Sequence, residues 1–121
     1  MQQRRRFRRI GVDLDGLIQF PHTGDEMDCM VRNISEECMG AMIFTPDQRI
    51  RKREDVNLDI FIPTERTPIL CSGKIVWYSE DEEAFRNYKG YSAGIIITDI
   101  SRIDQRRLEL VMARSATPDL Y

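Results

Sequence analysis

A chain of 121 residues can form one ordinary domain with a single hydrophobic core, and it is too short for two. Apolar residues make up 41% of the chain and charged residues 31%, a balance typical of globular proteins in water. No stretch approaches the roughly 20 consecutive apolar residues that a membrane-spanning helix requires, so this class of protein is excluded.

The beginning of the chain holds a dense cluster of positive charge. Five of the first nine residues are arginines, namely Arg4, Arg5, Arg6, Arg8 and Arg9. This segment carries +5, whereas the remainder has 13 basic against 20 acidic side chains and carries −7. A guanidinium group presents several donors in a planar fork, and this geometry matches phosphates and the O6/N7 edge of guanine. The cluster therefore indicates recognition of a shaped anion.

The cysteine and histidine content argues against disulfides and metal sites. Cys29, Cys38 and Cys71 are an odd number without the spacing of metal ligands, and His22 is the only histidine. The basic beginning continues into glycines and aspartates instead of an apolar run, which is not the pattern of a secretory leader. We therefore expect a cytoplasmic protein with reduced thiols, no metal and no cofactor.

From residue 10 onward, short alternations of apolar and polar residues predict β-strands. The first covers residues 10–20, with a kink or bulge near residues 15–16. The others cover residues 27–34, 39–44, 56–62, 69–78 and 91–98, and the second and third form a hairpin. We expect an exposed acidic connection at residues 79–89. Because residues 95–97 are apolar on both faces, the last strand should be central or covered.

After the last strand, the apolar period changes to that of a helix. Ser101 is a suitable N-cap, and Asp104 would lie in the first turn, where a carboxylate complements the helix dipole. The apolar side chains expected near one face are Ile103, Leu108, Val111 and Met112. The helix should end near residue 115, ahead of Pro118.

Six strands followed by one helix predict a mainly β fold, an antiparallel barrel capped by its C-terminal helix. A parallel, doubly wound sheet would need helices between the strands, and no helical pattern lies there. The domain should cover residues 10–121, with residues 1–9 forming a flexible basic arm that becomes ordered when a ligand binds.

Three features of the chain, in this order, resemble the PilZ domain family. Arg5-x-x-x-Arg9 precedes the first strand, Asn33-Ile34-Ser35 ends the second, and the last strand leads directly into a helix. The resemblance covers nearly the whole chain and implies a six-stranded barrel that binds the bacterial second messenger cyclic di-GMP. In that family the ligand is bound by an RxxxR motif before the first strand and a [D/N]xSxxG motif in the barrel.

Carried onto this chain, the RxxxR motif falls on Arg5 and Arg9, with Arg4 and Arg8 giving an alternative register. We prefer the register with Arg9 because this residue directly precedes the first strand. The guanidiniums would donate to guanine edges and stack on the bases.

The second motif falls on Asn33 and Ser35, which we expect on the same face of a strand because two residues separate them. Their polar groups would complete the hydrogen bonding to the ligand. The glycine position of the motif holds Cys38, and the nearest glycine is Gly40. If the turn requires a positive φ, a Cβ at Cys38 costs about 1 kcal/mol and takes room from the ligand.

Each of these features also has a purely structural interpretation. A basic terminal run is most often a solvated tail, and Asn33 and Ser35 commonly close hairpins. Trp77 is more often a barrel residue than a platform for a base, and Cys38 has no activating neighbours in the sequence that would indicate a redox role.

We therefore expect a cyclic di-GMP receptor that signals by changing its arm and adjacent surface, with a separate effector protein as partner. The alternative is a PilZ-fold adaptor that acts through protein contacts without nucleotide binding. A nucleic-acid-binding arm is disfavoured because the rest of the chain carries −7. No enzyme is expected, because the acidic residues have no accompanying nucleophile or histidine, the candidates being Asp13, Asp15, Asp25 and Glu26.

Overall fold

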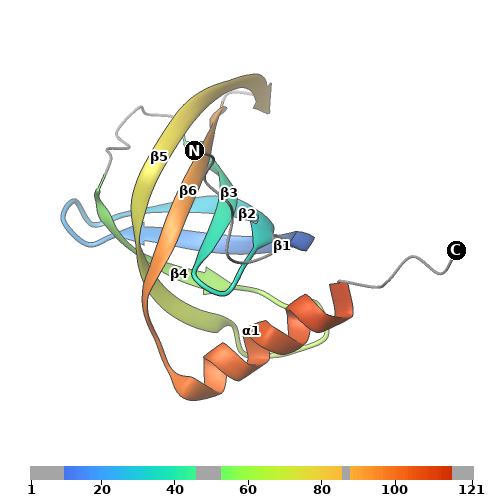
Figure 1. The fold of residues 1–121 in the computed structure, drawn as a ribbon. Coiled ribbons are helices and arrows are strands. Elements are labelled where there is room, and N and C mark those ends of the chain that lie inside the picture. Colours follow the sequence, from blue (N-terminus) through green and yellow to red (C-terminus); the bar gives the residue numbers. More distant parts are fainter. Residues whose placement is uncertain (1–9, 46–52, 86–87, 116–121) are drawn as a thin grey trace, which may run out of the picture.

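Six antiparallel strands close into a barrel, and one helix lies across an end of it (Figure 1). The structure, a computed structural model, describes residues 10–45, 53–85 and 88–115, without the side chains of 81–89. The elements are β1 (Ile10–Phe20), β2 (Asp25–Ile34), β3 (Cys38–Thr45), β4 (Asp55–Ile60), β5 (Ile69–Phe85), β6 (Tyr88–Ile100) and α1 (Arg102–Ser115). The strands pair in the order β1-β2-β3-β6-β5-β4, and β4 returns to β1. The predicted six-stranded barrel with a C-terminal helix is confirmed.

The hydrophobic core fills the barrel because alternate side chains of each strand point inward. In β4, Val56, Leu58 and Ile60 are buried, and the residues between them are more exposed. The fully buried side chains are mostly isoleucines, such as Ile18 and Ile95. Branched side chains suit this interior because they pack well on a pleated surface.

The start of the chain forms two hairpins, of which the second, β2 with β3, is the predicted one. Between β1 and β2, Gly24 adopts a φ of 79° and donates its N–H to the carbonyl of Phe20 at 2.8 Å. Glycine is suited to this position because a Cβ is disfavoured at positive φ. The hairpin of β2 and β3 places Asn33 opposite Gly40.

Helix α1 begins as predicted and closes one end of the barrel with two buried side chains. The Ser101 hydroxyl accepts the N–H of Asp104 at 3.1 Å, which is the geometry of an N-cap. Leu108 and Val111 are buried against the barrel. The prediction for Ile103 was wrong, because its side chain is 76% exposed.

Arg107 ties α1 to the segment between β4 and β5. Its guanidinium donates to Glu65 at 2.6 Å, to Asp104 at 2.9 Å and to the carbonyl of Pro68 at 3.0 Å. These bonds to Glu65 and then Asp104 raise the pKa of Arg107. Asp104 also accepts the N–H of Leu70 at 3.1 Å, so the first turn of the helix is fixed to β5.

Two expectations about the strands need correction, and a third holds in part. The irregularity in β1 lies between Gly11 and Leu14, not at residues 15–16. Residues expected in an exposed connection at 79–89 belong mostly to β5 and β6, which pair as far as Phe85 and Tyr88. The last strand is central, with β3 and β5 on either side, but it is not covered, because Ile96 is 43% exposed on the outer face. A closed barrel buries only the side chains on its inner face. A strand with apolar residues on both faces is therefore still exposed on its outer face.

Candidate functional site

The candidate site lies on the outer face of the barrel, where the chain enters β1. Ile10 pairs with Ile34, so the chain joins the barrel next to Asn33 and Ser35. The predicted ligand residues Arg4, Arg5, Arg8 and Arg9 lie outside the described residues. Sequence alone places them within six positions of this pairing.

Asn33 and Gly40 form the first part of the site. They are directly opposed in β2 and β3, and the Gly40 N–H donates to Asn33 Oδ1 at 3.1 Å. A Cβ on Gly40 would lie 2.8 Å from both terminal atoms of the Asn33 amide. The missing side chain of Gly40 therefore allows the Asn33 amide to lie flat against β3.

Gly94 and Trp77 repeat this arrangement on the next two strands. Gly94 in β6 pairs with Gly40 on one side and with Trp77 of β5 on the other. A Cβ on Gly94 would lie 2.1 Å from Nε1 of Trp77, so the indole rests directly on the glycine. The Trp77 side chain is still 40% exposed, which leaves part of the ring open to solvent.

These four residues make a row across β2, β3, β6 and β5, which we call the glycine row: Asn33, Gly40, Gly94 and Trp77. The three strand spacings give about 14 Å from end to end. The row has a flat floor, an amide at one end and an aromatic ring at the other. Such a surface can receive a planar polar ring, because the amide supplies hydrogen bonds and the indole a stacking face.

Ser35 has a different place from the one expected. The strand β2 ends at Ile34, and Ser35 is only 2% exposed in the following turn. Its hydroxyl lies 3.2 Å from the carbonyl oxygen of Cys38 and accepts the Cys38 N–H at 3.2 Å, and its own N–H donates to that carbonyl at 2.8 Å. Ser35 therefore closes the hairpin and does not share the outer face of Asn33.

Cys38 also differs from the expectation, because its Cβ carries no conformational cost. Among the described residues, positive φ occurs at Gly24 and, at 64°, at Arg53. Cys38 is the first residue of β3, half-buried, with its sulfur 3.2 Å from the Ser35 hydroxyl. The glycine that the local contacts require is Gly40.

The charges described around the row are mixed. Glu36 and Glu37 lie exposed in the turn that Ser35 closes. Lys74 lies two strands away from Cys38, because it pairs with Ile96 and Ile96 pairs with Cys38. The ammonium group of Lys74 lies 3.3 Å from a carboxylate oxygen of Asp55. Arg32 is exposed next to Asn33 in β2, and the arginines before Ile10 would add positive charge for binding an anion here.

Sequence reasoning missed Gly94 as part of the site and placed Trp77 in the barrel wall. The signal for Gly94 was weak, because a glycine in a strand indicates a close approach without naming the group that approaches. Strands β5 and β6 form a hairpin, but β6 also pairs with β3, which is not its neighbour in the sequence. The pairing of Gly94 with Gly40 could therefore not be found from local pattern.

Neither a metal centre nor a spanning helix is found in the part of the chain that the structure describes. Across residues 10–45, 53–85 and 88–115, no three histidine, cysteine or acidic residues gather as metal ligands would. The helix in these ranges is not long and apolar enough to cross a membrane.

Comparison with known proteins identifies the family and the fold of the chain that carries this site. A family model described as the PilZ domain matches residues 3–114. The PilZ domain of YcgR from Escherichia coli, solved with c-di-GMP, is similar in structure, with a TM-score of 0.72 and 14% identity over 93% of this chain and 92% of that one. No curated protein sequence matches the chain significantly.

Two longer proteins contain a similar fold. The inhibitor of motility MotI/DgrA from Bacillus subtilis has a TM-score of 0.70 and 21% identity, over 93% of this chain and 51% of that one. The MrkH–c-di-GMP complex from K. pneumonia has a TM-score of 0.68 and 15% identity, over 93% and 52%. This chain therefore spans about half the length of these two proteins.

Proposed function

Since this chain belongs to the PilZ domain family, we propose that it is a cyclic di-GMP receptor that signals to a separate effector protein. The observation that carries the proposal is the glycine row, which begins beside the start of β1, the strand that follows the arginine segment, residues 4–9. The similar PilZ domain of YcgR, solved with c-di-GMP, supports the choice of ligand. The three free thiols fit a reducing cytoplasm.

The ligand chemistry divides between the two parts of the site. Cyclic di-GMP carries two phosphates and two guanines, and Arg5 and Arg9 would bind these groups with charge-assisted hydrogen bonds. The Asn33 amide would bind a base edge, and the exposed part of the Trp77 ring would stack on a base. Ser35 would act indirectly, by holding the turn that follows Asn33.

Calorimetric titration with cyclic di-GMP tests this proposal, with GTP and a DNA oligomer as control ligands. Arg9→Ala should weaken binding by about 2 kcal/mol, because it removes a charge-assisted contact, and should leave the thermal midpoint nearly unchanged. Arg106→Ala is the matched control, since Arg106 is exposed on α1. Absence of heat at high micromolar cyclic di-GMP would refute the receptor function.

A second function has specific support in the turn at residues 35–38. The Ser35 hydroxyl is occupied by Cys38, and Glu36 and Glu37 place two carboxylates near the proposed anion site. Both features favour an adaptor that keeps the PilZ fold and acts through protein contacts without nucleotide. The same titration separates the two functions, because the adaptor would bind none of the three ligands.

A further inference from the structure

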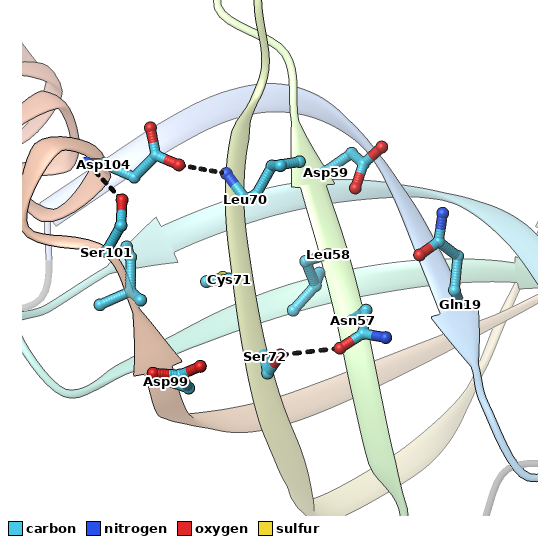
Figure 2. A pocket seen from close by; sticks show the side chains of 11 residues that line it. Gln19, Asn57, Leu58, Asp59, Leu70, Cys71, Ser72, Asp99, Ser101 and Asp104 are labelled. Carbon is cyan, nitrogen blue, oxygen red and sulfur yellow. Dashed lines mark hydrogen bonds between the residues drawn. The ribbon is translucent and has the colours of Figure 1, made fainter.

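A groove on a different part of the barrel surface is not used by the proposed ligand site. It has a volume of about 480 Å³ and lies over β1, β4 and β5, beside the beginning of α1 (Figure 2). Gln19, Asn57, Ser72 and Asp99 form a polar row across β1, β4, β5 and β6. Ser72 donates to Asn57 at 2.7 Å, so the floor of the groove is ordered.

The groove is negatively charged. Asp59, Asp99 and Asp104 line it, and none of its lining residues is lysine or arginine. The Asp104 carboxylate is bonded to Leu70 and Arg107, whereas the carboxylates of Asp59 and Asp99 form no ion pair or hydrogen bond within the described part of the chain. Burial, together with the charges of Asp104 and Asp59, raises the pKa of the adjacent Cys71 thiol to about 12.

An apolar side chain adjoins these carboxylates. Leu70 is 51% exposed and pairs with Asp59 across β5 and β4. A partner that combines guanidiniums with one apolar or aromatic side chain would match the groove in both charge and surface type.

We propose that this groove binds the arginine segment, residues 4–9, of a second copy of the chain. The segment carries five arginines around Phe7 and is the more basic of two runs in the sequence, the other being residues 49–53 with four basic side chains. Its guanidiniums would pair with Asp59 and Asp99, and Phe7 would cover Leu70. Charge complementarity supports this occupant, because the segment carries +5 and the rest of the chain −7.

The reach of the segment favours a second copy over the same barrel. Asp59 pairs with Leu17, which lies seven residues along β1 from Ile10, or about 23 Å. A chain running back from Ile10 covers at most about 21 Å in six residues. In its own barrel, therefore, the backbone of the segment falls short of Asp59, and Phe7, three residues before Ile10, is farther still from Leu70. Two copies that exchange segments satisfy both grooves in a closed symmetric dimer.

One consequence rests on the proposed function. If the same arginines bind cyclic di-GMP, the ligand and the groove compete for them, and ligand binding would separate the two copies. The ligand would then expose the groove to another partner. This gives the receptor a surface change that depends on the ligand.

Sedimentation equilibrium of the full chain at low salt, without ligand, tests the proposal. The wild type should form a dimer that weakens in 0.5 M NaCl, because salt screens exposed charges. Asp59→Asn with Asp99→Asn should weaken the dimer at least tenfold. The control Asp13→Asn with Glu109→Gln changes the charge equally at exposed positions outside the groove and should stay within twofold of the wild type.

A second experiment reverses the charges on both sides of the proposed contact, so that the result does not depend on the folding of a single variant. Arg4→Glu with Arg5→Glu, mixed with Asp59→Lys and Asp99→Lys, should associate more tightly than either variant alone. A wild type that is monomeric at millimolar concentration, or a dimer unaffected by the groove variant, would overturn the proposal. If the dimer forms as expected but cyclic di-GMP leaves it intact, the groove assignment stands, and the proposed use of these arginines for the ligand fails.

Discussion

The substitution Gly40→Ala tests the site at its best-defined contact. An added Cβ would lie 2.8 Å from Oδ1 and Nδ2 of Asn33, closer than such contacts occur. These atoms are at the end of a side chain, so the amide can rotate away without moving the backbone. The barrel then loses the hydrogen bond from the Gly40 N–H to Asn33, which is worth about 1 kcal/mol.

The expected effects on stability and on binding are therefore different. The free energy of unfolding should fall by no more than about 1 kcal/mol, and part of this is recovered because alanine restricts the unfolded chain. Affinity for cyclic di-GMP should fall about tenfold, or about 1.4 kcal/mol, because the amide leaves the place where it meets the ligand. Urea unfolding and calorimetric titration measure the two quantities.

Gly11→Ala is the matched control, because no atom lies within 4 Å of the Cβ it would add. It should leave the free energy of unfolding unchanged or slightly raised, and it controls for stability alone because Gly11 pairs with Asn33. The reasoning would be refuted if Gly40→Ala bound cyclic di-GMP as well as the wild type while Asn33→Ala bound poorly. Asn33 would then act from an orientation other than the one it has against Gly40.

Three further predictions follow from described contacts. The emission of Trp77, the only tryptophan, should change on ligand binding, and Trp77→Leu should weaken binding about tenfold through lost stacking; an unchanged spectrum at saturation would contradict this. Burial raises the pKa of Cys29 and of Cys71 from 9.0 to about 12. Above pH 9 the thiols ionise in the unfolded chain only, so the free energy of unfolding should fall by at most about 1.4 kcal/mol per pH unit for each thiol. In Cys29→Ala, this fall with pH should be smaller. Arg107→Met should cost about 2 kcal/mol in urea unfolding, against little for Arg106→Ala, and equal losses would mean that the contacts of Arg107 do not hold α1.

The architecture could be predicted because each element has its own local signal. Alternation in β4 and the N-cap at Ser101 identified a strand and a helix from a few residues each. The same local signals failed where burial depends on distant elements. Ile103 has the helical spacing of a core residue, but the end of the barrel meets α1 at Leu108 and Val111, and Ile103 remains in solvent.

The candidate site was predicted only in part, for a related reason. Asn33 and Gly40 belong to one hairpin, and short spacing in the sequence brings them together. Gly94 and Trp77 join them through pairings of β6 with β3 and β5, and residues 54 positions apart in the sequence become neighbours. No periodicity within one strand contains that information.

The departure at Cys38 illustrates what a motif position means physically. A glycine can be required by a positive φ or by a group that lies on its backbone. At Cys38 the first reason is absent, and the Cys38 sulfur contacts only the closing Ser35 hydroxyl among the described hydrogen bonds. At Gly40 the second reason holds, because the Asn33 amide occupies the space of the missing side chain. The requirement for glycine in this hairpin therefore lies directly opposite Asn33, and a cysteine two residues earlier is compatible with a binding surface on the outer face.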